Sequence, residues 1–240
     1  MTDFIETTKE EMNNHACVVL EFSGGRDSIA SLLSLQPWAD NLHVVHLDTC
    51  DSPLEVQKTV REFAKLFGRN FHVVRSSSYA VRAEFGHPSP VVMSDKPLFS
   101  EGTPLMQPQF ECCMRTIMLP LHQYVLGLGA TMIIRGQRDS DCHKNPIEHL
   151  AVSEGIVYAY PVNDKTDAEI DAICGDLLPS FYEFTKDAPD CMTCTGYWGR
   201  GYQQWLRSVD KKLADDRKER VSALIASLVP ILRTGMLEIE

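Results

Sequence analysis

The sequence predicts an α/β fold, a doubly wound parallel sheet with a helical C-terminal extension. Short apolar runs typical of buried strands alternate with segments whose apolar residues recur at helical spacing, and such alternation favours a parallel sheet. Polar loops follow the strands, as expected where ligands bind at the carboxyl ends of the strands. Strands are expected at residues 17–22, 43–47, 71–74, 131–134 and 157–160.

Helices are expected between and after these strands. Pro53 opens one that Gly68 ends, and Thr166 with Glu169 forms a capping box for another. Residues 75–111 lose periodicity and carry several prolines, which indicates a long segment that is either mobile or functional. The expected helical stretches are residues 1–15, 29–35, 53–67, 114–128 (kinked or started at Pro120), 167–177, 197–217 and 218–233.

Composition and charge exclude several classes of protein. No stretch approaches the roughly 20 apolar residues of a membrane span, and the acidic N-terminus is unlike a signal peptide. The net charge of −10 argues against indiscriminate binding to nucleic acid. Eight cysteines without a secretory signal favour a reducing compartment, with metal binding or catalysis for some of them. The expected protein is cytoplasmic, has no membrane contact and forms a homo-oligomer.

A Gly-rich turn, SGGRDS, joins the first strand to the first helix of the expected sheet. Glycine lets the backbone approach a ligand closely, and the free N–H groups at a helix start attract anions. The spacing fits neither a Walker A loop nor a Rossmann fingerprint. The turn resembles the SGGxDS loop of the PP-loop ATP pyrophosphatase superfamily, which implies binding of the ATP pyrophosphate; the plainer interpretation is a capped strand-to-helix turn. The candidate binding residues are Ser23, Gly24, Gly25, Arg26, Asp27 and Ser28.

Two further strand-end segments carry charged side chains. Arg135, Gly136 and Arg138 follow the fourth strand, where arginine is well matched to phosphate geometry, although a solvated loop is equally consistent with the pattern. Asp27 and Asp48 are candidates for holding Mg²⁺ carried by a nucleotide. For Asp27, an ordinary first-turn carboxylate is the alternative.

Four cysteines form two pairs, Cys112-Cys113 and Cys191-Met192-Thr193-Cys194. A C-x-x-C pair places two thiolates on one turn, and a second pair makes a four-thiolate centre a plausible interpretation. Zinc and an iron–sulfur cluster both remain candidates, because the spacing favours a cluster only modestly.

The cysteine arrangement resembles that of the assimilatory adenylyl-sulfate reductases of the PAPS reductase family. His46-Leu47-Asp48-Thr49, Pro120-Leu121, the segment 134–138 and Tyr160-Pro161 with Thr166 look like further motifs of that family. The resemblance implies an adenine nucleotide α-hydrolase-like fold, an adenine nucleotide (ATP or adenylyl sulfate) as ligand and a [4Fe-4S] cluster on the four cysteines. It also implies a nucleotide-binding domain over residues 1–180, with residues 181–240 as a C-x-x-C and helical extension packed on it.

The chain departs from that family in two respects. No cysteine follows Cys194, so the family's C-terminal nucleophile is missing, and SGGRDS is the form of loop found in enzymes that cleave ATP. Cys142, near histidines and cations, is the first candidate to replace the nucleophile and Cys50 the second, with Asp27 also in the catalytic set. For each of these two cysteines taken singly, an ordinary thiol is the favoured interpretation.

Three functions follow from this resemblance and these departures. The first is reductive sulfur or sulfonucleotide chemistry with an external thiol. The second is ATP-dependent adenylation and sulfur transfer from a sulfur donor to a small-molecule or nucleic-acid acceptor, although the net charge does not indicate nucleic acid. The third is a non-catalytic nucleotide or iron–sulfur sensor.

The C-terminal third is expected to be structural. Aromatic residues after the C-x-x-C pair should form core, and basic residues interleaved with acids should lie on solvated helix faces. The aromatic residues are Tyr197, Trp198, Tyr202 and Trp205, and the basic ones are Arg200, Arg207, Lys211, Lys212, Arg217, Lys218 and Arg220.

Overall fold

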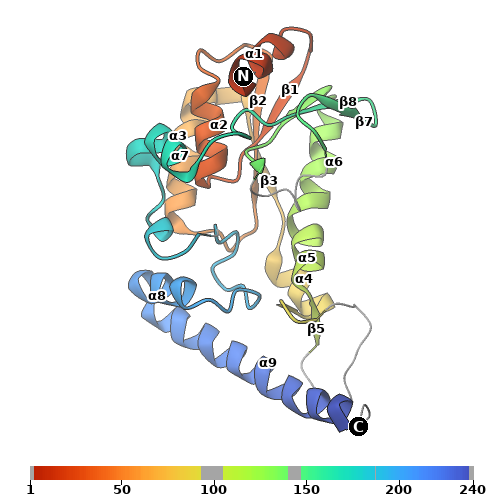
Figure 1. The fold of residues 1–240 in the computed structure, drawn as a ribbon, viewed down its shortest axis with the longest axis vertical. Coiled ribbons are helices and arrows are strands. Elements are labelled where there is room, and N and C mark those ends of the chain that lie inside the picture. The colour runs from red at the N-terminus through yellow and green to blue at the C-terminus, as the bar shows by residue number, and fades with distance from the viewer. Residues whose placement is uncertain (1–2, 93–104, 140–146, 187, 238–240) are drawn as a thin grey trace. The chain divides into compact units, whose positions relative to one another are not determined.

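The structure is a computed structural model that describes residues 3–92, 105–139, 147–186 and 188–237 (Figure 1). Contacts within the chain divide it into two compact units. Unit 1 comprises Met1–Asp48, Leu54–Arg75 and Pro120–Ser180, and unit 2 comprises Thr49–Pro53, Ser76–Leu119 and Phe181–Glu240. The expected domain division at residue 180 stays a prediction.

A six-stranded sheet forms the centre of unit 1, in the order β3-β2-β1-β6-β8-β7. Every neighbouring pair is parallel except β7 and β8, which are antiparallel. The predicted doubly wound parallel sheet is therefore confirmed, and β7 is an additional edge strand that is too short to show periodicity in the sequence. The strands are β1 (Val18–Glu21), β2 (Leu42–Asp48), β3 (Phe71–Arg75), β6 (Met132–Ile134), β7 (Ala151–Ser153) and β8 (Ile156–Ala159).

Helices cover both faces of this sheet, with α2, α3 and α7 on one side and α6 on the other (Figure 1). Helix α2 packs against α7. The capping box at the start of α7 is confirmed, because Thr166 N donates to Glu169 Oε2 at 2.8 Å and Glu169 N donates to Thr166 Oγ1 at 3.4 Å. The helices of unit 1 are α1 (Phe4–Met12), α2 (Arg26–Ser34), α3 (Leu54–Phe67), α6 (Leu119–Gly127) and α7 (Asp167–Cys174), with short 3₁₀ turns at Gly68–Asn70 and Gly175–Leu177.

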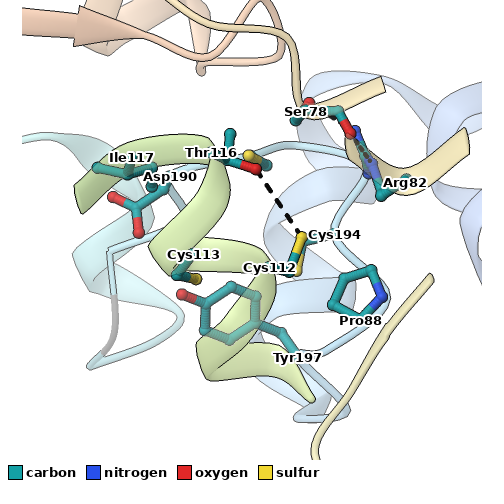
Figure 2. A pocket seen from close by; sticks show the side chains of 11 residues that line it. Ser78, Arg82, Pro88, Cys112, Cys113, Thr116, Ile117, Asp190, Cys194 and Tyr197 are labelled. Atoms are coloured by element: carbon teal, nitrogen blue, oxygen red, sulfur yellow. Dashed lines mark hydrogen bonds between the residues drawn. The ribbon is translucent and has the colours of Figure 1, made fainter. Parts of the chain in front are cut away.

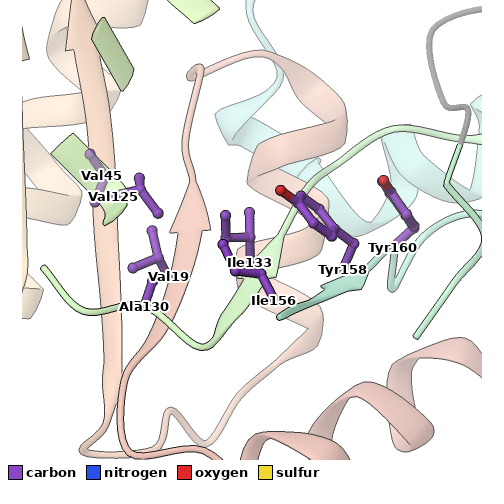
Figure 3. Close-up of a cluster of buried hydrophobic side chains, with 8 residues drawn as sticks. All are labelled: Val19, Val45, Val125, Ala130, Ile133, Ile156, Tyr158 and Tyr160. Atoms are coloured by element: carbon purple, nitrogen blue, oxygen red, sulfur yellow. The ribbon is translucent and has the colours of Figure 1, made fainter. Parts of the chain in front are cut away.

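The core of unit 1 lies along the central strands (Figure 3). Val19, Val45 and Ile133 are completely buried on β1, β2 and β6, and Val125 of α6 packs with them. Since the central strands are covered on both faces, they appear in the sequence as continuous apolar runs rather than alternating ones. This buried framework fixes the strand ends from which the polar loops emerge.

Unit 2 is mainly helical and differs from the prediction in two places. The stretch without periodicity contains helix α4 (Ser78–Phe85) and the parallel two-stranded pair of β4 (His87–Ser89) and β5 (Met106–Pro108). The boundary expected between residues 217 and 218 is wrong, because Asp210 separates α8 (Arg200–Val209) from α9 (Lys211–Leu237). Asp210 Oδ1 accepts from Leu213 N at 2.9 Å, as an N-cap does. The remaining helices are α5 (Gln109–Cys113), a π-helix (Met114–Met118) and a 3₁₀ turn (Ser180–Glu183).

The π-helix stands immediately before Pro120, where the sequence predicted a kink or a start. Proline cannot donate a backbone hydrogen bond, and a wider turn before it is one way a helix accommodates that loss. In unit 2, Tyr202 and Trp205 are buried, with Trp205 edge-on to Phe181, so their assignment to core is confirmed. The same assignment is wrong for Trp198, which is 38% exposed. None of the helices in the described ranges is both long and apolar enough to cross a bilayer.

Candidate functional site

The SGGRDS turn lies at the carboxyl end of β1 and begins α2. Gly24 N and the Ser23 hydroxyl each donate to Ser28 Oγ at 3.1 Å, while Gly25 N donates to Ser23 Oγ at 3.2 Å. Gly24 has φ +78°, and a Cβ there would stand 2.8 Å from Cγ1 of Val56. The two hydroxyls therefore close a turn that requires glycine, and the turn presents the start of a helix.

Gly136 brings the end of the β6 strand against this turn. A Cβ at Gly136 would stand 2.6 Å from the backbone carbonyl carbon of Asp27 and 2.7 Å from Ser28 N. Strands β1 and β6 are neighbours at the point where the strand order reverses. Open parallel sheets bind ligands at such a switch point, so the loop and the segment 135–138 form one candidate anion site within unit 1.

Carboxylates hold two of the predicted phosphate-binding arginines. Arg26 Nη2 and Arg138 Nη1 both reach Asp167 Oδ1, at 3.0 Å and 2.6 Å. Arg138 Nε also lies 2.8 Å from Asp27 Oδ1, and Arg26 Nη1 lies 3.5 Å from Asp171 Oδ1. The hydrogen bond from Arg138, together with Arg26, lowers the pKa of Asp167. Two guanidinium groups thus converge on a single half-exposed carboxylate oxygen, a geometry that a phosphate oxygen could also satisfy.

Arg135 and Asp48 have other partners. Arg135 forms a fork with Glu21, with Nε–Oε2 at 2.6 Å and Nη2–Oε1 at 3.3 Å. Burial opposes the charge of Arg135, but Glu21 outweighs it and raises the pKa of the guanidinium. Asp48 Oδ2 lies 4.0 Å from Nε of the exposed Arg75. Sequence reasoning did not identify Glu21, Asp167 and Asp171 as partners of the arginines. Asp167 and Asp171 nevertheless lie on α7, a helix that the sequence predicted from its capping box.

The four paired cysteines line one cavity within unit 2 (Figure 2). The cavity encloses about 360 Å³ of space, including solvent at its mouth. Cys112 and Cys194 are buried, whereas Cys113 and Cys191 are half-buried. The remaining lining residues are Ser78, Arg82, Pro88, Thr116, Ile117, Asp190 and Tyr197.

The chemistry of this donor set fits a metal–thiolate centre. Burial raises the pKa of all four thiols, that of Cys194 to about 11, so binding of a cation would have to displace protons. Within the described ranges, no three His, Cys, Asp or Glu side chains are arranged to hold a metal ion as they stand. The four sulfurs therefore share a cavity without a finished coordination geometry.

A buried ion pair fixes the C-x-x-C segment, and the sequence did not reveal it. Arg82 Nη2 lies 2.9 Å from Asp51 Oδ2, and Thr193 N donates to the same oxygen at 3.1 Å. Arg82 Nη1 donates to Thr193 Oγ1 at 2.8 Å, and Tyr79 OH donates to Asp51 Oδ1 at 3.0 Å. Met192 N donates to the backbone carbonyl of Asp51 at 2.7 Å. Asp51 of loop 49–53 thus holds Met192 and Thr193, the two residues between the cysteines, by hydrogen bonds.

Of the two candidate nucleophiles, Cys50 lies within the described residues. Cys50 is exposed on loop 49–53 and has φ +60°, an uncommon conformation for a residue with a side chain. Cys142 lies outside the described residues. Cys174, which the sequence left unassigned, is buried in unit 1, where burial raises its pKa to about 12 and its thiol donates to Arg26 O at 3.2 Å.

The expectation that Arg217 lies on a solvated face of its helix is wrong, because only 3% of this residue is exposed. Ala214, Arg217, Leu224 and Leu228 are all buried on this helix. Their spacing of three, seven and four residues places them on one helical stripe, and that periodicity was a signal that could have found Arg217.

Comparison with known proteins gives a matching family and many solved structures of similar fold. The sequence matches the phosphoadenosine phosphosulfate reductase domain over residues 17–170, whereas a search of curated proteins gave no match. The fold is similar to that of phosphoadenylyl-sulfate reductase from Candida auris in its phosphate complex, with 14% identity, a TM-score of 0.50, and 74% of this chain and 81% of that chain covered. The NH3-dependent NAD synthetase from Campylobacter jejuni subsp. jejuni NCTC 11168, in complex with nitrate ion, gives 16% identity, a TM-score of 0.49, and coverage of 91% and 90%. At such identities the likeness to the reductase concerns the fold alone.

Proposed function

This chain belongs to the phosphoadenosine phosphosulfate reductase family, and on that premise we propose that it is a PP-loop enzyme of sulfur metabolism. Unit 1 binds an adenine nucleotide, and the four cysteines of unit 2 hold a [4Fe-4S] cluster. The reaction is reductive sulfur or sulfonucleotide chemistry. The observation that carries the nucleotide part is the glycine turn at the start of α2, packed against Gly136 at the switch point of the sheet.

In this proposal the nucleotide's phosphates lie at the start of α2. Backbone N–H groups and the hydroxyls of Ser23 and Ser28 would bind phosphate oxygens. Arg26 and Arg138 are close by and share Asp167, so a bound phosphate would compete with that carboxylate for two guanidinium groups. Arg135 contributes less directly, because Glu21 already occupies its fork.

The proposed cluster rests on the donor set of unit 2. A tandem pair and a C-x-x-C pair supply four thiols to one cavity, and thiolates select iron–sulfur clusters or zinc rather than hard cations. The cysteines at positions 112, 113, 191 and 194 would each provide one thiolate. When bound, a [4Fe-4S] cluster would supply an anionic centre that can change its oxidation state, although the electrons of the reaction below come from thiols, and zinc in its place would leave only a structural role.

For the reductive reaction, the atoms balance with two thiols and adenylyl sulfate. A thiolate attacks the sulfur, an S–S bond forms, and the S–O bond to AMP breaks. A second thiol then releases sulfite and leaves a disulfide, with both electrons coming from the thiols. An external thiol, Cys50 or Cys142 would be the first nucleophile.

A second function is favoured by one observation, the SGGRDS form of the loop at residues 23–28. In ATP-dependent sulfur transfer, an acceptor oxygen attacks the α-phosphorus of ATP and releases pyrophosphate. Hydrosulfide then replaces the adenylated oxygen and AMP leaves. The acceptor would be a small molecule or a nucleic acid.

Product analysis distinguishes these reactions. Anaerobically purified protein is incubated with adenylyl sulfate plus a thiol and, separately, with ATP. Sulfite plus AMP from adenylyl sulfate supports the reductase, whereas AMP plus pyrophosphate from ATP supports sulfur transfer. If protein with a full complement of iron and sulfide binds nucleotide but forms neither set of products, the reductase proposal is wrong. The remaining alternatives are then sulfur transfer with an obligatory acceptor and the sensor. Gly127→Ala, at an open position in α6, serves as the matched variant that should behave like wild type.

A further inference from the structure

Arg217 has an unusual environment for a buried cation. Its Nε donates to the carbonyl oxygen of Cys194 at 2.7 Å, its Nη1 donates to Gln203 Oε1 at 2.8 Å, and its Nη2 donates to the carbonyl oxygen of Tyr197. Its guanidinium carbon stands 4.4 Å from the ring centre of Tyr202. All of these partners are neutral, and none of the described carboxylates lies within ion-pair distance of Arg217.

The other buried arginine of unit 2 is different. Arg82, which lines the cysteine cavity, is neutralised by Asp51 of the same unit. Asp190 also lines the cavity but forms no ion pair with Arg217. A buried charge without a counter-charge is strongly unfavourable. Among the described residues of unit 2, Arg217 is thus a buried cation that contacts the C-x-x-C segment and whose counter-charge is not a carboxylate.

An anionic metal–thiolate centre would supply that counter-charge. Four thiolates carry more negative charge than either a [4Fe-4S] core or a zinc ion carries positive charge, so the occupied site is an anion. Arg217 donates to the backbone of one of the four cysteines, which places its charge beside that anion. The electrostatic effect is large where burial excludes water.

We infer that Arg217 is the counter-cation of the metal–thiolate centre and a positioning residue for the C-x-x-C segment. The inference rests on the proposed function, since it requires that the four cysteines bind a metal. Its consequence is specific to charge. A fixed cation stabilises the more negative, reduced state of a cluster, so loss of the charge should make the centre harder to reduce and easier to lose.

Two substitutions separate charge from hydrogen bonding. Arg217→Gln keeps donors but removes the charge, and Arg217→Lys keeps the charge with fewer donors. The matched control is Arg207→Gln on α8, because Arg207 pairs with Asp215 at 2.6 Å on the exposed surface of the same unit. Each protein is reconstituted anaerobically, and iron and sulfide content and the midpoint potential of the cluster are measured.

We expect Arg217→Gln to make reduction at least tenfold less favourable, a shift of about 59 mV to more negative potential for one electron, with lower iron content. The midpoint potential and iron content of Arg217→Lys should be much closer to those of wild type. Those of Arg207→Gln should equal those of wild type. The inference is overturned if Arg217→Gln behaves like Arg207→Gln, or if Lys and Gln shift the potential equally. Should Arg217→Gln not fold, the Lys variant decides alone, because a folded Lys variant that has lost its cluster refutes a role based on charge.

The outcome for the wild-type protein distinguishes this inference from the proposed function. If wild type binds zinc instead, competition with a chelator replaces the potential, and a tenfold weaker zinc affinity is expected for Gln but not for Lys. If wild type binds neither iron–sulfur nor zinc, the four-cysteine centre is wrong and the inference fails with it. Nucleotide binding by unit 1 is measured separately and is unaffected by that result.

Discussion

Arg82 Nη2 lies 2.9 Å from Asp51 Oδ2 in an ion pair that is buried within unit 2. The hydrogen bond and the charge of Asp51 raise the pKa of Arg82 in spite of burial, which acts in the opposite direction. Because Asp51 also accepts from Thr193 N, the pair fixes the middle of the C-x-x-C segment. A substitution at Asp51 should therefore change the position of the C-x-x-C segment at the cysteine cavity.

Asp51→Asn tests that connection. The substitution leaves the Arg82 charge buried without a counter-charge and should lower the free energy of unfolding by roughly 3–5 kcal/mol. The control, Asp215→Asn, breaks an exposed pair with Arg207 and should change it by less than about 1 kcal/mol. Urea unfolding of the metal-free protein measures both. Equal effects of the two substitutions would show that the buried pair does not hold the segment.

Gly136→Ala should disturb the candidate nucleotide site. The added Cβ would meet the backbone carbonyl of Asp27 at 2.6 Å, and backbone cannot give way as a flexible side chain can. We expect a loss of roughly 1–3 kcal/mol in the free energy of unfolding and weaker ATP binding by calorimetry. Gly127→Ala, which meets nothing within 4 Å, should be neutral or slightly stabilising. Unchanged ATP affinity in Gly136→Ala would separate this segment from the nucleotide site.

The glycine turn of unit 1 and the Asp51 contacts of unit 2 differ in how far apart their partners lie in the sequence, and this difference decided which of them the sequence could predict. Gly24, Gly25 and the capping box of Thr166 depend on neighbours within a few residues, so local patterns predicted them. The partners Asp51 and Thr193 lie 142 residues apart, and nothing local marks either as buried.

The same limit applies to the charged groups. Glu21 and Arg135 are 114 residues apart, so a sequence pattern could propose the arginine but not the carboxylate that holds it. Tertiary packing, rather than residue type, decided that Arg217 is buried while Arg207 is exposed.

Cys50→Gly distinguishes a reactive thiol from a structural one. Cys50 has φ +60°, where glycine is favoured, so the substitution should be neutral or stabilise folding by up to about 1 kcal/mol. If Cys50 is the nucleophile, Cys50→Gly should abolish sulfite release while retaining nucleotide binding and iron content. Cys174→Ser is a control for loss of a thiol outside the proposed chemistry. Full activity in Cys50→Gly would leave an external thiol or Cys142 as the nucleophile.

The ion pairs of Asp167 predict a loss of stability in acid. Arg138 and Arg26 lower the pKa of Asp167 in the folded state. A group whose pKa is lower in the folded state stabilises folding above its unfolded pKa of about 4, and this contribution disappears as the pH falls through the folded pKa. Asp167→Asn should therefore destabilise the protein at neutral pH and flatten the acid limb of its pH–stability profile. Because Asp167 is half exposed, the effect should shrink with added salt. Chemical unfolding across the acid range, with Asp215→Asn as the control, measures it, and identical acid limbs for wild type and Asp167→Asn would mean that water already screens the two arginines from this carboxylate.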